Sequence, residues 1–220
     1  MIGYWNYTVY ATYASALSAL FGFMCCLAGK PLAAVFCLLL SAGLDMIDGR
    51  IARSKPDRTR DEKRYGVQLD SLADLLAFGA LPCLIYVSEC RLVSGHTGFF
   101  PALLGALFAL CCLIRLAFFN VRTAGMEEVS DSGKLDFKGL PAPSIALPLA
   151  LIYCFKPAMS PRGFLWLFTF LLLIVGLAYI TPFLSLIWTS VVLKEPFNLY
   201  SLLGLLLIVT GIVVQMGKKK

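Results

Sequence analysis

The sequence contains little charge and almost no histidine. Charged residues make up 15% of the 220 residues, hydrophobic residues make up 59%, and His96 in SGHTG is the single histidine. A soluble domain of this length is closer to half apolar, so a water-soluble fold is excluded. One histidine in a short connecting segment also disfavours a histidine-based catalytic or metal site.

Paired CxxC motifs are also absent. The eight cysteines lie mostly inside apolar runs. Small apolar side chains of this kind fill gaps between helices, and metal or redox cysteines usually come in close pairs. We therefore interpret the cysteines as packing residues.

Long apolar runs are abundant. They are about 20 residues long, enough to cross a hydrocarbon core of about 30 Å, and they are continuous rather than alternating, which excludes a transmembrane β-barrel. The sequence predicts an all-α polytopic membrane protein with one domain over residues 1–220. We expect a six-helix transmembrane core over 1–181 and a C-terminal helical hairpin over 182–216. The predicted spans lie near 7–28, 31–52, 67–88, 99–121, 141–157, 162–180 and 197–216, with a further apolar stretch after Pro182.

The distribution of basic residues orients these spans. The segment 50–64 holds seven lysines and arginines, and the last three residues are lysines. Basic loops stay in the cytoplasm, so the N-terminus, the segments 50–64 and 122–140 and the C-terminal lysines are predicted to be cytoplasmic. No basic leader or small-residue cleavage site precedes the first apolar run, which we expect to be a retained span. We expect an integral protein of the cytoplasmic membrane of a prokaryote.

The basic segment 50–64 has two interpretations. It is either a topology signal alone or an attraction for anionic lipid or an anionic substrate. Its charges face a membrane and lack interleaved aromatic residues, so nucleic acid is not an expected partner.

Four aspartates lie at the cytoplasmic ends of the second and third spans. Asp45 and Asp48 are three residues apart and Asp70 and Asp74 are four apart, so each pair shares one face of its helix. Antiparallel consecutive spans can bring the two faces together. Four carboxylates in one place require a compensating cation, and oxygen ligands suit Mg²⁺ or Mn²⁺. The alternative is that these acids merely pair with nearby arginines at the interface.

Small residues and an arginine accompany the aspartates and favour a binding site. Gly49 and Gly66 flank the cluster, where a backbone can approach a ligand closely, and Arg53 is suited to a bidentate phosphate contact. The combination indicates a site for metal, phosphate and nucleotide.

The spacing resembles the signature of the CDP-alcohol phosphotransferase family, D-x2-D-G-x2-A-R followed by G-x3-D-x3-D. Here it reads DMIDGRIAR from Asp45 to Arg53 and GVQLDSLAD from Gly66 to Asp74. Twelve residues separate Arg53 from Gly66, where the family usually has eight. The four extra residues lie in a charged stretch that we expect to be a loop-like connection between helices.

The resemblance implies a six-span core, often a homodimer, that transfers a substituted phosphate from a CDP-linked donor to an alcohol and releases CMP. It implies that Asp45, Asp48 and Asp70 hold one divalent cation and that Asp45, Asp70 and Asp74 hold a second, either Mg²⁺ or Mn²⁺. Asp74 is similar to the residue proposed as general base. By the same resemblance, the cytidine and diphosphate contacts would come from Gly49, Ala52, Arg53 and Gly66.

A second pair of motifs resembles the phosphatidylserine synthase branch of that family. RLAFFN begins at Arg115 and FKGLPAP begins at Phe137. The resemblance implies CDP-diacylglycerol and L-serine as substrates, and membrane lipids as surroundings. Residues that could contact the acceptor or a lipid phosphate are Arg115, Asn120, Arg122 and Lys138. The alternatives are snorkelling or an aspartate salt bridge for Arg115 and ordinary interfacial positions for the others.

Three functional alternatives remain open at this point. A sibling enzyme would use glycerol 3-phosphate or an inositol phosphate as acceptor, which demands a denser basic site. An ether-lipid donor is a second alternative. A cation transporter would need carboxylates near the middle of the membrane, whereas these lie at one edge beside Gly49 and Arg53.

Overall fold

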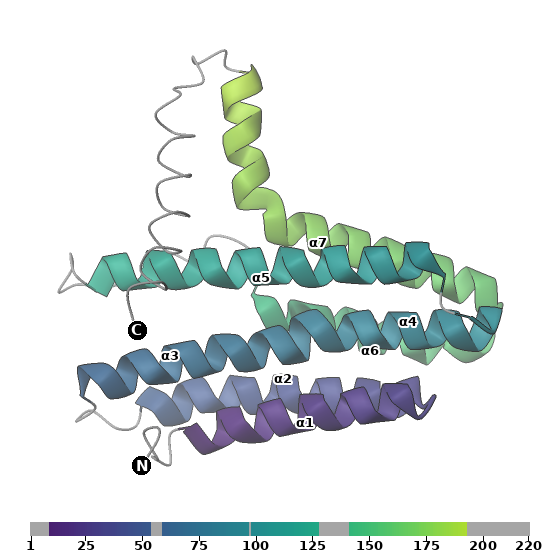
Figure 1. Ribbon diagram of the computed structural model, residues 1–220, viewed down its shortest axis with the longest axis horizontal. Coiled ribbons are helices and arrows are strands. Elements are labelled where there is room, and N and C mark those ends of the chain that lie inside the picture. The colour runs from purple at the N-terminus through teal and green to yellow at the C-terminus, as the bar shows by residue number, and fades with distance from the viewer. Residues whose placement is uncertain (1–8, 54–58, 97, 128–140, 193–220) are drawn as a thin grey trace, which may run out of the picture. The chain divides into compact units, whose positions relative to one another are not determined.

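The computed structural model describes residues 9–53, 59–96, 98–127 and 141–192, and the side chains among them except at 52–53, 60, 122–127 and 182–192. The described elements are all helical (Figure 1). They are α1 (Tyr10–Leu27), α2 (Pro31–Arg53), α3 (Arg60–Asp74), η2 (Leu75–Ala80), α4 (Leu81–Ser94), α5 (Phe99–Glu127), η3 (Ala142–Ile145), α6 (Ala146–Phe155), η4 (Lys156–Ala158) and α7 (Pro161–Val192).

Five of these helical stretches are long and apolar enough to cross a membrane. They are Tyr10–Leu27, Pro31–Ile51, Asp61–Ser94, Phe99–Val121 and Pro161–Thr181. The sixth predicted core helix is present as the shorter apolar stretch Ala142–Ala158. The prediction of an all-α polytopic membrane protein is confirmed.

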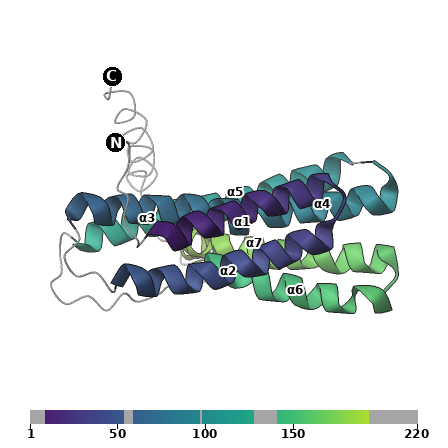
Figure 2. The ribbon, with the colours of Figure 1, turned by 90° about the horizontal axis from the view of Figure 1, so that it is seen from below.

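The chain divides into two units, residues 1–180 and residues 181–220. Within the first unit the helices run alongside one another in both views (Figure 1, Figure 2). The division falls beside the predicted end of the core at 181. However, α7 continues through Pro182 to Val192, with no helix boundary there. The predicted last span near 197–216, and with it the hairpin, lies outside the described residues.

The third membrane helix begins earlier than the sequence pattern suggests. Residues 60–65, expected to be loop-like, form the first turns of α3. Thr59 accepts a hydrogen bond from the Glu62 backbone N–H at 3.2 Å, and the Glu62 carboxylate accepts one from the Thr59 N–H at 3.0 Å. This capping box satisfies two N–H groups at the helix start. The acidic side chains of Asp61 and Glu62 further stabilise the helix, because they lie at the positive end of its dipole. The loop prediction was wrong here because the T-x-x-E pattern caps a helix start even in a strongly charged segment.

The first two helices pack through small and polar residues. The buried face of α1 consists of Thr12, Ser15, Ser18, Ala19, Gly22 and Cys26. The Ser15 and Ser41 hydroxyls each donate to the other residue's carbonyl oxygen, at 3.3 and 3.0 Å. Large side chains such as Leu17 and Phe21 point outward. Membrane helices associate in this way because lipid accommodates large apolar side chains and small ones permit close approach.

Aromatic side chains join α4, α6 and α7. Phe168 contacts Tyr86 and Tyr153, with ring centroids 5.2 and 6.3 Å apart. Beside them, Tyr153 donates a 2.9 Å hydrogen bond to Glu89, which also pairs with Lys156. Glu89 is only 1% exposed, so this network ties α6 to α4 with a satisfied buried charge.

The cysteines fit the packing interpretation. All eight are free, and Cys26, Cys90 and Cys112 are buried in the helix core.

Candidate metal and active site

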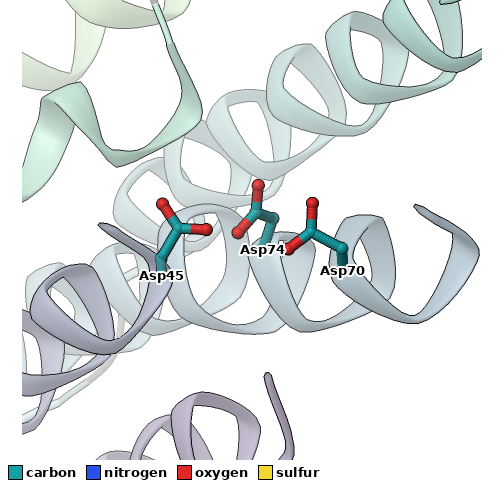
Figure 3. Close-up of side chains that lie close together, drawn as sticks. All are labelled: Asp45, Asp70 and Asp74. Carbon is teal, nitrogen blue, oxygen red and sulfur yellow. The ribbon is translucent and has the colours of Figure 1, made fainter. Parts of the chain in front are cut away.

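Three aspartates from two helices converge. Asp45 on α2 and Asp70 and Asp74 on α3 each offer a carboxylate oxygen, and these oxygens lie within 4.8 Å of one another. Figure 3 shows Asp74 between the other two, with the three carboxylate groups turned toward the same space. All three side chains are half-buried. Asp45 thus meets Asp70 and Asp74, which follow it by 25 positions or more in the chain, as the sequence pattern predicts.

The electrostatics of this group require a positive partner. Carboxylates this close in a half-buried place repel one another, and they cannot all stay ionised without a proton or a cation between them. The donors are all carboxylate oxygens, which suit a hard divalent cation. The residues present therefore fit a divalent metal, and the cluster Asp45, Asp70 and Asp74 could hold one.

Asp48 is the most buried of the four aspartates, at 7% exposure. Its Oδ2 accepts a 3.0 Å hydrogen bond from the Thr12 hydroxyl on α1. It lies outside the group of three whose oxygens are mutually close. Sequence reasoning missed Thr12, although its place on a regular stripe of small and polar residues indicated a buried face.

An irregular helix segment directly follows Asp74. Residues Leu75–Ala80 form a π-helix between α3 and α4, a rare form that is frequent at functional sites. Within it, a Cβ added to Gly79 would lie 3.4 Å from the Cβ and Sγ of Cys112. Gly79 therefore permits the close approach of this segment to α5, the helix that carries Arg115.

The predicted nucleotide residues lie on the same two helices. Gly49 follows Asp48 in α2, and Gly66 lies one turn before Asp70 in α3. Ala52 and Arg53 end α2, and their side chains are outside the described set.

The predicted acceptor residues are placed unequally. Asn120 accepts a 2.9 Å hydrogen bond from Ser71, the neighbour of Asp70. The Arg115 guanidinium carbon lies 5.4 Å from the ring centroid of Tyr179. Arg122 lies in α5 without a described side chain, and Lys138 lies outside the described residues.

One further contact between α1 and α3 was not anticipated. The Tyr13 and Tyr65 hydroxyls are hydrogen-bonded at 2.9 Å. Tyr65 directly precedes Gly66, so this hydrogen bond holds the start of the second motif against α1.

The fold and the converging aspartates define a polytopic membrane protein with an acidic, metal-competent site. The model of the CDP-alcohol phosphatidyltransferase family matches residues 5–193, and the chain belongs to this family.

Several curated proteins are similar to the chain. A CDP-diacylglycerol–serine O-phosphatidyltransferase of Saccharomyces cerevisiae is 35% identical over 159 residues, which are 68% of this chain and 54% of that protein. An archaetidylserine synthase of Methanothermobacter thermautotrophicus is 34% identical over 57% of this chain and 48% of its own length. A CDP-diacylglycerol–serine O-phosphatidyltransferase of Helicobacter pylori is 35% identical over 54% of this chain and 44% of its own length.

The matched regions thus span about half the length of these relatives. A search of the solved structures found no match.

Proposed function

We propose that this protein transfers a phosphatidyl group from CDP-diacylglycerol to L-serine, giving phosphatidylserine and CMP. The observation that carries this proposal is the convergence of Asp45, Asp70 and Asp74 in a member of the CDP-alcohol phosphatidyltransferase family. The names of the yeast and Helicobacter relatives give serine as the acceptor, and the archaeal relative is named for a lipid that contains serine. Those names differ in the lipid, so the acceptor is better supported than the donor.

The aspartates would act both as metal ligands and as a base. Asp45, Asp48 and Asp70 would hold one divalent cation, and Asp45, Asp70 and Asp74 a second, either Mg²⁺ or Mn²⁺. When bound, such ions neutralise a diphosphate and stabilise the CMP leaving group. Asp74 would accept the proton of the serine hydroxyl as that oxygen bonds to the phosphorus that carries the diacylglycerol. The bond from this phosphorus to the bridging oxygen of CMP breaks, and CMP leaves.

The residues of the two motifs other than the aspartates would hold the donor. Gly49, Ala52 and Gly66 would face the cytidine, where small residues allow close approach, and Arg53 would contact the diphosphate. The acyl chains of the donor would stay in the bilayer while its headgroup reaches the aspartates.

The setting we propose is the cytoplasmic membrane of a prokaryote, with the aspartates at the cytoplasmic face. The support is the basic segment 50–64, which lies between the two motifs. We also propose a homodimer, as the family resemblance implies. No nucleic-acid partner is expected, because the basic residues of the segment 50–64 face a membrane and lack interleaved aromatic residues.

The test is CMP release by purified protein with CDP-diacylglycerol and Mn²⁺ or Mg²⁺. Serine, glycerol 3-phosphate and an inositol phosphate are supplied separately, and a CDP-linked ether lipid replaces the donor in a parallel series. We expect release with serine and none from Asp70→Asn. Release only with a phosphate-bearing acceptor would retain the family chemistry and reject serine.

A further inference from the structure

The helix α3 carries two of the three clustered aspartates but has little apolar packing of its own. Among its described side chains Ala73 alone is buried, whereas Val67 and Leu72 are exposed. Buried apolar surface is what usually fixes one helix against the next. Because that contribution is small in α3, contacts between polar side chains matter more for how this helix is turned about its axis.

One such contact joins α3 to α5. The Ser71 hydroxyl donates a hydrogen bond of 2.9 Å to Oδ1 of Asn120, and its oxygen also lies 3.0 Å from the carbonyl oxygen of Val67. Ser71 and Asn120 are 49 positions apart, and both side chains are half-buried. A hydroxyl can donate and accept, so the contact persists for either orientation of the Asn120 amide. The bond therefore ties the rotation of α3 to α5.

Ser71 lies between the two aspartates of α3. It directly follows Asp70 and precedes Asp74 by three residues, the spacing of neighbours on a helix surface. Since a side-chain tip lies about 5 Å from the helix axis, a turn of α3 by about 10° would move both carboxylates by about 1 Å. Metal–ligand distances tolerate only about 0.2 Å. A small rotation of α3 would therefore misplace Asp70 and Asp74 relative to Asp45 on α2.

We propose that Ser71 and Asn120 are positioning residues, and that the hydrogen bond between them holds Asp70 and Asp74 in the orientation that binds a divalent cation together with Asp45. This inference rests on the metal site of the proposed function and adds to it a pair of residues that act through α3. Asn120 then serves the reaction through Ser71 instead of contacting the acceptor.

The test is the affinity of the purified full-length protein for Mn²⁺. The dissociation constant is measured by electron paramagnetic resonance without substrates, so the readout does not depend on catalysis. Ser71→Ala and Asn120→Ala each remove one side of the hydrogen bond, and the double variant removes both. Ser71→Thr keeps the hydroxyl. Because alanine is a better helix former than serine, Ser71→Ala should not weaken α3 itself.

Thr169→Val is the matched control. The Thr169 hydroxyl has the same two kinds of contact as that of Ser71. It donates a 2.8 Å hydrogen bond to the Leu165 carbonyl one turn earlier, and it is hydrogen-bonded to Tyr86 of another helix at 2.8 Å. Tyr86 follows Asp74 by 12 positions, which is about 18 Å along a helix. The control therefore removes an equivalent bond away from the aspartates.

We expect the dissociation constant for Mn²⁺ to rise about fivefold in Ser71→Ala and in Asn120→Ala, and no further in the double variant, because both changes remove the same bond. Ser71→Thr and Thr169→Val should bind Mn²⁺ like the wild type. In assays of CMP release, kcat should fall in both single variants while the KM for serine stays within twofold. A purely structural role would lower the melting temperature and leave the affinity for Mn²⁺ unchanged.

A rise in the KM for serine in Asn120→Ala, with unchanged Mn²⁺ affinity, would assign Asn120 to the acceptor and overturn the inference. Additive losses of affinity in the double variant, or an equal loss in Thr169→Val, would also overturn it. If the wild type binds Mn²⁺ but releases no CMP with serine, the proposed function fails, and the affinities still decide the inference. If the wild type binds no Mn²⁺, the inference fails with the metal site.

Discussion

Thr12 on α1 donates a hydrogen bond of 3.0 Å to Asp48 on α2, and the pair is buried. The two residues are 36 positions apart, and Asp48 begins the D-G-x2-A-R half of the family motif. A helix that carries none of the motif thus orients one of its aspartates. Groups that orient a ligand are often nearly as important for metal affinity as the ligand itself.

The first prediction concerns this contact. Thr12→Val removes the hydroxyl at nearly constant volume, and it should weaken Mn²⁺ affinity about tenfold. Thr12→Ser should restore most of it. Bound Mn²⁺ is measured by electron paramagnetic resonance on purified protein, independently of activity. Ser18→Ala is the control, because it removes an α1–α2 hydrogen bond to Cys37 without touching Asp48. Equal affinities in Thr12→Val and the control would argue against a role for Thr12 in metal binding.

The second prediction concerns the charge of the aspartate group. Without metal, Asp45, Asp70 and Asp74 repel one another, so Asp70→Asn should raise the melting temperature in EDTA by a few degrees. Added Mn²⁺ should stabilise the wild type by mass action and leave the variant almost unchanged. Thermal unfolding in detergent, with and without metal, measures both effects. A wild-type melting temperature that does not respond to Mn²⁺ or Mg²⁺ would count against the metal site.

The third prediction concerns the buried Glu89 carboxylate of α4 and its partners Tyr153 and Lys156. Lys156→Met leaves the Glu89 carboxylate buried with Tyr153 as its described donor, and it should destabilise the protein by about 2 kcal/mol. Lys156 is itself 39% exposed, which reduces the loss below that of a fully buried pair. The double variant Glu89→Leu with Lys156→Met should recover much of the stability, because no unpaired charge remains. Denaturant unfolding of the wild type, of Lys156→Met, of Glu89→Leu and of the double variant gives the coupling energy between the two residues. Additive losses of stability would mean that Glu89 and Lys156 do not stabilise the fold as a pair.

The fourth prediction concerns the π-helix. Gly79→Val places branched atoms where a Cβ alone would lie 3.0 Å from Leu75 Cδ1 and 3.4 Å from Cys112. Since protein interiors tolerate little extra volume, we expect a loss of about 1–3 kcal/mol and lower CMP release, because α5 carries Arg115. Adding Cys112→Ala makes room and should rescue part of both. Gly43→Val is the matched control, since no atom lies within 4 Å of a Cβ there. If Gly43→Val is equally harmful, close packing on Cys112 is not the cause.

Much of the architecture follows from local sequence properties. Apolar length defines the membrane helices because a bilayer accepts only segments that satisfy their own backbone hydrogen bonds. The predicted starts at 31, 99 and 162 lie within a residue of α2, α5 and α7. The predicted start of the third span lies too late in the sequence. The capping box at Thr59 begins α3 at Arg60 despite the charge of residues 60–65.

The aspartate site was also predictable in part from the sequence. Spacings of three and four residues place each pair on one helix face, and short motifs at adjacent helix ends make their approach predictable. Asp45, Asp70 and Asp74 accordingly converge. The contacts of Thr12 with Asp48, Tyr13 with Tyr65 and Ser71 with Asn120 each join different helices. Such contacts depend on the rotation and depth of one helix against another, which the pattern along a single helix does not contain.

The partners of Arg115 could not be predicted from the sequence pattern. Its position in an apolar run marks it as unusual, but the run leaves open whether it meets an aspartate, the lipid interface or a substrate. In the folded chain the Arg115 guanidinium lies over the ring of Tyr179, 64 residues later. Composition and periodicity suffice for helices and for motif faces because both are local. The partners of a buried polar group come from helix packing, since packing brings together residues that are distant along the chain.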